Sequence, residues 1–182
     1  MSNQSGKNKE STLAALLQEK PKRGRPRHDV SRQNVYVALT ASEKRHMRRL
    51  ATEMPESIVR ADVPDLAVTI LSARLEAMRR AVADRNREIP EGVTDFDSLY
   101  LLWDMALPDS AEERKWTSIR LSPQEAIELG RVQGMLNAAF GATRSDTFSL
   151  GLALLTQHLE DHTLSADFSL SDVRNQIISI YL

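Results

Sequence analysis

One strand-and-helix pattern occurs twice in this sequence, and the repetition restricts the folds open to the chain. In residues 117–121 threonine or aliphatic side chains alternate with polar ones, the period-two pattern of a strand with one buried face. Ser122 then offers an N-cap, Pro123 suits the first helical position, and Glu125 completes a capping box. These residues predict a strand that runs directly into a helix.

The same pattern begins 82 residues earlier, in the segment 34–43. Under that offset, Val37, Leu39, Thr40 and Glu43 fall on Ile119, Leu121, Ser122 and Glu125. The apolar stripe of the following helix repeats too, with Met47, Leu50 and Met54 falling on Leu129, Val132 and Leu136. A single short strand leaves its backbone groups unpaired. We therefore expect a mainly α fold in which the two strands pair as a short antiparallel β-ribbon.

A second helix is expected in each copy. In the first copy it starts near Asp62–Asp65 and runs to about Val82, with an inward face of Leu66, Ile70, Ala73 and Ala77. In the second copy Gly141 is the expected C-cap of the preceding helix, and a capping box of Thr143 and Asp146 opens the next one. Its expected inward face is Phe148, Leu152, Leu155 and Leu159.

The elements divide the chain into five predicted segments. They are a disordered basic arm (1–33), a first half (34–83), a connector (84–115), a second half (116–162) and a C-terminal helical tail (163–182). The connector is expected to hold a packed helix over 95–106 that includes Trp103, with Leu107 packed after it. The tail is expected to form a helix from Ser171, with Val173, Ile177 and Ile180 apolar, that completes the core or makes a dimer contact.

Charge is distributed unevenly along the 182 residues. The formal net charge is −1, yet residues 1–50 hold twelve Lys and Arg against four Asp and Glu, a local charge of +8. Such a front fits either a polyanionic partner or a solubilising tail. The absence of cysteine excludes disulfides and thiol catalysis. The polar N-terminus and the lack of a long apolar run lead us to expect a cytoplasmic protein with no membrane contact.

The basic front contains a motif that resembles an AT-hook. Its core is Arg23, Gly24, Arg25 and Pro26, followed by Arg27. Glycine lets a backbone lie deep in the narrow minor groove of A·T-rich DNA, proline keeps it extended, and arginine is attracted by the negative potential there. The alternative is an ordinary solvated basic run.

Strand–helix–helix, present twice, resembles the ribbon-helix-helix superfamily of DNA-binding proteins, to which the Arc and MetJ repressors belong. The likeness covers roughly residues 34–82 and 116–160, and it is best at the second strand and at the inter-helix turn 141–146. Most members build the unit from two identical chains, whereas here one chain would form a pseudo-dimer. The tandem architecture is also similar to accessory proteins of conjugation-like DNA transfer.

The resemblance implies which side chains touch double-stranded DNA. The outward residues of the ribbon, which read bases in the major groove, would be Asn34, Tyr36, Ala38, Ser118 and Arg120. Arginine pairs with guanine and asparagine with adenine. Because the two strands differ, the site is expected to be asymmetric. Trp116 flanks this set, and an aromatic residue at a strand start is usually packed.

The family's second helix binds phosphate at its N-terminus, a role that falls on Thr143, Arg144 and Ser145. In the first half, Asp62 and Asp65 would repel phosphate. Arg45, Arg48 and Arg49 are then the alternative contacts, or a solvated helix face.

No catalytic or cofactor-binding constellation is visible, so we do not expect an enzyme, a cofactor or a metal. His158 and His162 are spaced for one helix face and read as a metal pair or as two surface histidines. Two functions remain: a sequence-specific DNA-binding protein, such as a repressor or a plasmid partition or transfer factor associated with the nucleoid, and a protein-interaction module, such as an antitoxin or adaptor. Self-association of pseudo-dimers also remains open.

Overall fold

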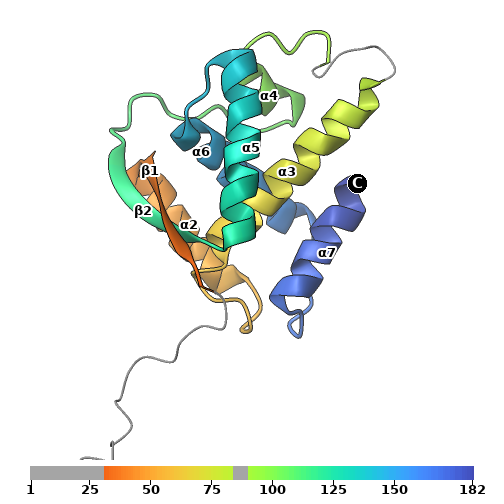
Figure 1. The fold of residues 1–182 in the computed structure, drawn as a ribbon. Coiled ribbons are helices and arrows are strands. Elements are labelled where there is room, and N and C mark those ends of the chain that lie inside the picture. The colour runs from red at the N-terminus through yellow and green to blue at the C-terminus, as the bar shows by residue number, and fades with distance from the viewer. Residues whose placement is uncertain (1–30, 84–89) are drawn as a thin grey trace, which may run out of the picture. The chain divides into compact units, whose positions relative to one another are not determined.

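The computed structural model describes residues 31–83 and 90–182. In these residues the chain forms six helices and one two-stranded antiparallel sheet. The elements are β1 (Gln33–Leu39), α2 (Ala41–Glu53), α3 (Val63–Ala81), α4 (Asp97–Leu102), β2 (Lys115–Leu121), α5 (Pro123–Phe140), α6 (Arg144–Asp161) and α7 (Leu170–Tyr181). The ribbon of β1 and β2 lies along one side of the helices, and α7 lies beside α3 (Figure 1). The predicted mainly α class with a short ribbon is confirmed.

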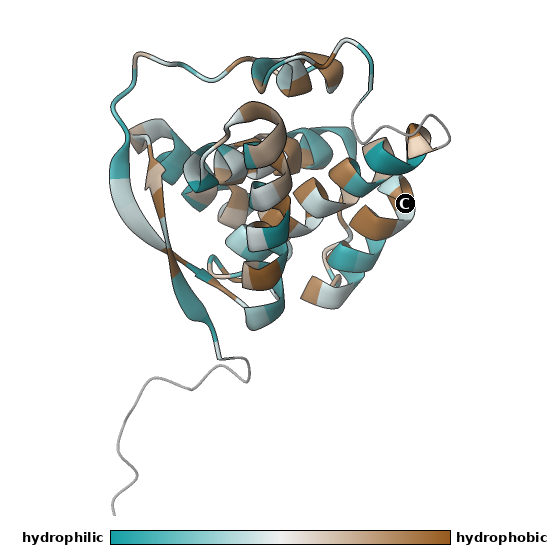
Figure 2. Ribbon diagram, turned by 45° about the horizontal axis from the view of Figure 1, so that its top comes forward, coloured by the Kyte–Doolittle hydropathy of each residue, from teal (hydrophilic) through white to brown (hydrophobic). Residues whose placement is uncertain are grey.

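The two strands pair with Tyr36 opposite Ser118 at the centre of the ladder. These two residues stand 82 positions apart, so the register is centred on equivalent positions of the two halves. Hydrophilic and hydrophobic residues interchange along both strands (Figure 2). Val37, Leu39, Ile119 and Leu121 are almost wholly buried against the helices. The predicted inward face of each strand is therefore confirmed, and the alternating side chains must point outward.

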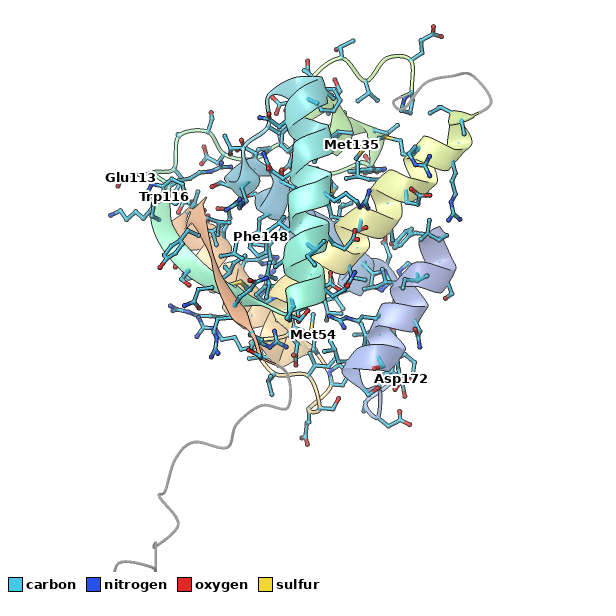
Figure 3. The ribbon with its side chains drawn as sticks, viewed as in Figure 1. Met54, Glu113, Trp116, Met135, Phe148 and Asp172 are labelled. Atoms are coloured by element: carbon cyan, nitrogen blue, oxygen red, sulfur yellow. The ribbon has the colours of Figure 1, made fainter. Side chains whose placement is uncertain are left out.

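The apolar stripes that repeat in the sequence form one core. Met47, Leu50 and Met54 of the first half are buried, and so are Leu129, Val132 and Leu136 of the second. The second helices, α3 and α6, pack closely at Gly151. A Cβ atom added to Gly151 would lie 2.6 Å from the carbonyl oxygen of Ala67 in α3. Only glycine permits this approach. Phe148, which is fully buried, lies between the ribbon and α5 (Figure 3).

Helix α3 is the central element of the described fold, which the predicted single inward face did not anticipate. Every residue from Val63 to Leu71 is buried, since α5, α6 and α7 all pack against this helix. Ala77, in contrast, is only partly buried. The tail completes the core: α7 places Val173 and Ile177 against α3 with no exposed surface, whereas Ile180 is 40% exposed.

Two capping predictions had different outcomes. The Thr143–Asp146 box is present, and Gly141 adopts the left-handed conformation that ends α5. The box predicted for Ser122 and Glu125 is wrong, because the backbone N–H of Ser122 donates to Asp65 of α3 at 2.9 Å instead. The Glu125 carboxylate, which does not cap α5, is buried and accepts a hydrogen bond from the Thr69 hydroxyl. Tertiary contacts have displaced the local cap.

The connector helix is shorter than predicted. Residues 95–106 were expected to be helical, but α4 ends at Leu102 because Asp104 adopts a positive φ of 54° and Met105 N–H bonds back to the Tyr100 carbonyl. Leu99 and Tyr100 are buried, Trp103 is partly buried and Leu107 is 51% exposed. The connector thus covers the core with a single turn and a half of helix.

Candidate nucleic-acid interface

The outward face of the ribbon presents six side chains in three cross-strand pairs. The pairs are Asn34 with Arg120, Tyr36 with Ser118, and Ala38 with Trp116. Five of the six residues are exposed, and Ala38 is partly exposed. Neighbours directly opposite in an antiparallel ladder have Cβ atoms about 5 Å apart, so each pair forms one continuous contact surface. The five residues predicted from the sequence are thus brought together on a single face.

Trp116 belongs to the same face, and the expectation that it would be packed is wrong. Its side chain is 74% exposed, more than the 63% of Tyr36. It lies on the outer side of β2, away from the helices (Figure 3). The repeat already contained the signal, because Trp116 is the equivalent of Asn34 at the 82-residue offset and must share its orientation.

The start of α6 is the helix N-terminus predicted to bind phosphate. Thr143 and Arg144 are exposed, and the Thr143 N–H and hydroxyl both bond to the Asp146 carboxylate. Arg114 forms an ion pair with the same carboxylate. Burial favours the neutral acid, but the hydrogen bonds from Thr143 and Arg114 outweigh it and hold the pKa of Asp146 below its ordinary value. Arg114 thus compensates the negative charge of Asp146, and the nearby Arg144 side chain is exposed to solvent.

Ser145 fills a different position from its two neighbours. It is buried, and its hydroxyl accepts a hydrogen bond of 2.8 Å from the backbone N–H of Ala38 in β1. The side chain therefore fastens the outward-facing strand to α6. A phosphate contact by Ser145 would have to use its backbone N–H, as helix N-termini commonly do.

The start of α3 differs from the start of α6. Asp62 and Asp65 are buried rather than exposed to a ligand, and both form ion pairs with Arg32, which lies 3.0 Å from Asp65. The guanidinium also donates to the carbonyl oxygen of Ala61. Arg32 was predicted as part of a disordered basic arm, yet its side chain is 8% exposed. The carboxylates at the start of α3 are thus paired with an intramolecular cation.

Three carboxylates and two arginines share this buried cluster. Arg174 of α7 lies 3.5 Å from Asp65 and 3.3 Å from Glu125. Burial raises the pKa values of Asp65 and Glu125 above those of ordinary carboxylates, although Arg174 favours the charged form of both. We define Arg32, Asp62, Asp65, Glu125 and Arg174 as the ionic cluster. It joins the start of β1 to α3, α5 and α7.

Basic side chains continue along α2. Arg45, Arg48 and Arg49 are all exposed. Arg49 pairs with Glu53 at 3.2 Å, and the pKa of Glu112 is lowered by hydrogen bonds from Ser42 and also by the charge of Arg45. Arg45, Arg48 and Arg49 remain predicted phosphate contacts.

Of the two interpretations of His158 and His162, the one that makes both of them surface histidines is wrong for His158. His158 has no exposed surface, stacks on His162 at 4.6 Å and lies 3.2 Å from the Tyr181 hydroxyl. Burial, together with His162 and Arg74, lowers the pKa of His158 to about 4. Within residues 31–83 and 90–182, no cluster of three or more potential ligands is placed to bind a metal ion. His158 is therefore a core residue that anchors α7.

The AT-hook-like residues 23–27 lie outside the described part of the chain. In the described residues no helix is long and apolar enough to cross a membrane. No protein-family model, curated protein or solved structure matches this chain.

Proposed function

We propose that this chain is a sequence-specific double-stranded DNA-binding protein of the ribbon-helix-helix type, with both halves of the DNA-reading unit in one polypeptide. Its β-ribbon enters the major groove, Arg144 and the N-terminus of α6 contact backbone phosphate, and the basic arm follows the adjacent minor groove. A two-stranded ribbon fits the major groove of B-DNA, which is about 12 Å wide. The observation that carries the proposal is the solvent-exposed outward face of the ribbon.

The register supports the pseudo-dimeric part of the proposal. In a dimer of identical chains, a two-fold axis would pass between equivalent residues of the two strands. The pair at the centre of this ladder, Tyr36 and Ser118, is the pair that the 82-residue offset makes equivalent. Buried residues of the two strands and of α2 and α5 match under the same offset. The proposal therefore gives a single chain the internal symmetry that the family obtains from two.

Electrostatics supports DNA over a neutral partner. Arg114, Lys115 and Arg120 lie on or beside β2, and the arginines of α2 follow β1 in sequence. Arginine bonds guanine bidentately, and cations neutralise phosphates. The proposal gives Arg120 and Asn34 the purine contacts, while Ser118 and Tyr36 form hydrogen bonds to neighbouring groups. It makes the protein a repressor or a partition or DNA-transfer accessory factor.

The test is selection of bound duplexes from fragmented genomic DNA, followed by gel shifts at fixed salt. Arg120→Ala is expected to cost about 1–3 kcal/mol at one base-pair position and to relax specificity there. Arg80→Ala is the matched control. Arg80 is an exposed arginine in the last turn of α3, and it is not part of the proposed interface. Equal affinity of wild type and Arg120→Ala for every selected site would contradict base reading by the ribbon.

The basic arm is tested separately. Deletion of residues 1–30 keeps Arg32 and the ionic cluster intact, so the body should retain its fold. We expect affinity to fall for all sequences alike and the dependence of affinity on salt to become shallower, because fewer counterions are released. Unchanged salt dependence would remove the arm from the proposed interface while leaving the ribbon in it.

A protein-interaction role is the second candidate, and exposed leucines in the connector favour it. Leu101 is 66% exposed, Leu102 46% and Leu107 51%. They lie in or beside a segment that borders a hollow of about 1030 Å³ between α2 and α6. Self-association through this surface is tested by sedimentation of wild type against Leu101→Ser and Leu107→Ser. This candidate would be favoured if the wild type forms oligomers that the two variants do not form, and if neither the wild type nor the variants bind DNA.

A further inference from the structure

The two ends of the outward ribbon face have opposite chemistry. At one end Asn34 and Arg120 stand opposite each other and offer an amide and a guanidinium. At the other end Ala38 and Trp116 stand opposite each other and offer a methyl group and an indole. The two pairs are four residues apart along each strand, which separates them by about 13 Å, or about four base-pair steps. The face is therefore polar at one end and apolar at the other.

Trp116 is unusual because so much indole surface is open to solvent. The residue is 74% exposed, and its cross-strand partner Ala38 is too small to cover it. In the part of the chain that the structure describes, no ring stacks on it and no guanidinium lies over it. Tryptophan is the residue type most enriched among those that dominate binding energy at interfaces. Its position makes it part of whatever surface the ribbon contacts.

The major groove contains one apolar group that matches this end of the ribbon. Thymine carries a 5-methyl group at the groove edge, and apolar side chains discriminate thymine by contact with it. Guanine and adenine instead present acceptors and an amino group, which suit arginine and asparagine. The two ends of the face are thus complementary to different base pairs.

We propose that Trp116, with Ala38, contacts thymine methyl groups at one end of the DNA site, while Arg120 and Asn34 contact purines at the other, so that the ribbon binds in one orientation. The inference rests on the proposed DNA-binding function and adds a specificity-determining residue and a polarity to it. Trp116 would determine which of the two possible orientations the ribbon adopts along the DNA site. The pseudo-symmetry of the ladder alone does not distinguish these orientations.

Removal of a single methyl group tests the contact. In a selected duplex, thymine is replaced by uracil at each position in turn, which removes the 5-methyl group and leaves base pairing unchanged. Uracil at the Trp116 end is expected to weaken wild-type binding about fourfold, the equivalent of one buried methyl group. In Trp116→Ala the same replacement should have a clearly smaller effect, because only Ala38 still contacts the methyl group, while Arg120→Ala should retain the fourfold effect.

Two controls separate a lost contact from a lost fold. Trp116 is exposed, so Trp116→Ala should match wild type in circular dichroism and thermal midpoint. Ile127→Ala, which alters an exposed apolar residue of α5, should leave the uracil effect intact. In a Trp103→Phe background Trp116 is the sole tryptophan. Its emission should change on titration with the selected duplex, and a duplex with uracil at that end should need about fourfold more DNA to reach the midpoint.

Orientation is tested through cysteine labelling, which the absence of native cysteine makes specific. Ser31 lies beyond the Arg120 end of the ribbon and Glu113 beyond the Trp116 end, and both are exposed. A DNA-cleaving iron chelate on Ser31→Cys should cut one flank of the site, and one on Glu113→Cys the other flank, on the side of the uracil-sensitive thymines.

The outcomes distinguish the inference from the function on which it rests. Cleavage of both flanks by each label, or a uracil effect that keeps its full fourfold size in Trp116→Ala, overturns the inference alone. If no duplex is selected, the proposed function and the inference both fail. If Trp116 emission responds to a second copy of the chain and not to DNA, the outward face is a protein contact and the inference is wrong.

Discussion

The starts of α3 and α6 hold equivalent places in the two halves and have opposite environments. At α6, Arg144 is exposed and the neighbouring Asp146 is balanced by Arg114. At α3, the equivalent position is Asp62, which is buried and paired with Arg32. One helix end presents an exposed arginine to solvent, whereas the other has a buried aspartate paired with a cation of the same chain. The two copies of the repeat therefore match in their buried apolar residues but differ at the starts of α3 and α6.

The largest test of this contrast is removal of the cation at α3. Arg32→Met leaves Asp62 and Asp65 buried with one cation fewer, and loss of one partner from a buried ion pair costs about 3–5 kcal/mol. We expect the free energy of unfolding in urea to fall by that amount. Arg80→Ala, an exposed control, should change it by less than about 1 kcal/mol. Equal effects of the two substitutions would show that the cluster does not seal the helix.

The corresponding tie at α6 should be weaker. Ser145→Ala removes the acceptor for the Ala38 N–H and should cost about 1–2 kcal/mol of unfolding free energy. Ser149→Ala on the same helix is the matched control, because Ser149 is also buried but its hydroxyl has no hydrogen-bond partner in the described structure. A loss as large in Ser149→Ala as in Ser145→Ala would contradict a specific link between β1 and α6.

Arg144 tests the solvent-facing side of the comparison. If it contacts phosphate, Arg144→Ala should weaken binding to all selected duplexes alike and reduce the slope of log affinity against log salt by about 1. Fold stability should stay unchanged, since the residue is exposed. Gel shifts at four salt concentrations, with Arg80→Ala as reference, measure this. A sequence-dependent loss would instead assign Arg144 to base contact.

The smallest effect concerns protonation within the ionic cluster. Burial raises the pKa of Glu125, so the folded protein holds the Glu125 proton more tightly than the unfolded chain does. Its contribution to stability is therefore fully present below the unfolded pKa of about 4.5 and is lost as pH rises through the folded value. Relative to wild type, Glu125→Gln should gain stability between pH 4 and 7.5. Glu56→Gln provides an exposed baseline, and a gain of the same size there would contradict this origin.

The sequence predicted the elements that depend on short-range patterns. Alternation gave the inward face of the ribbon, and the Thr143–Asp146 box and Gly141 gave the ends of α5 and α6. The repeat predicted antiparallel pairing of the two strands, and the structure adds the register, in which Tyr36 lies opposite Ser118. The same reasoning applied to Trp116 would have placed it outward, and a general tendency of aromatic residues to pack was the weaker guide.

The errors arose where distant residues compete for one group. Ser122 and Glu125 have a local capping pattern, but Asp65 reaches the Ser122 N–H from another helix and Arg174 attracts the carboxylate. Arg32 looks like any cation of the basic arm, and its burial depends on two aspartates about thirty residues away. His158 similarly owes its burial to α7. Local periodicity contains no information about such contacts.

Because both strands of the ribbon belong to one polypeptide, the ribbon does not dissociate on dilution. Two separate chains would have to meet first, and the fraction of assembled ribbon would depend on their concentration. In this chain formation of the ribbon is therefore independent of protein concentration. Linkage also lets each half change alone, since a substitution in a homodimer appears twice and here appears once. Trp116 and Asn34, at equivalent positions, show how far two such halves can diverge within one ladder.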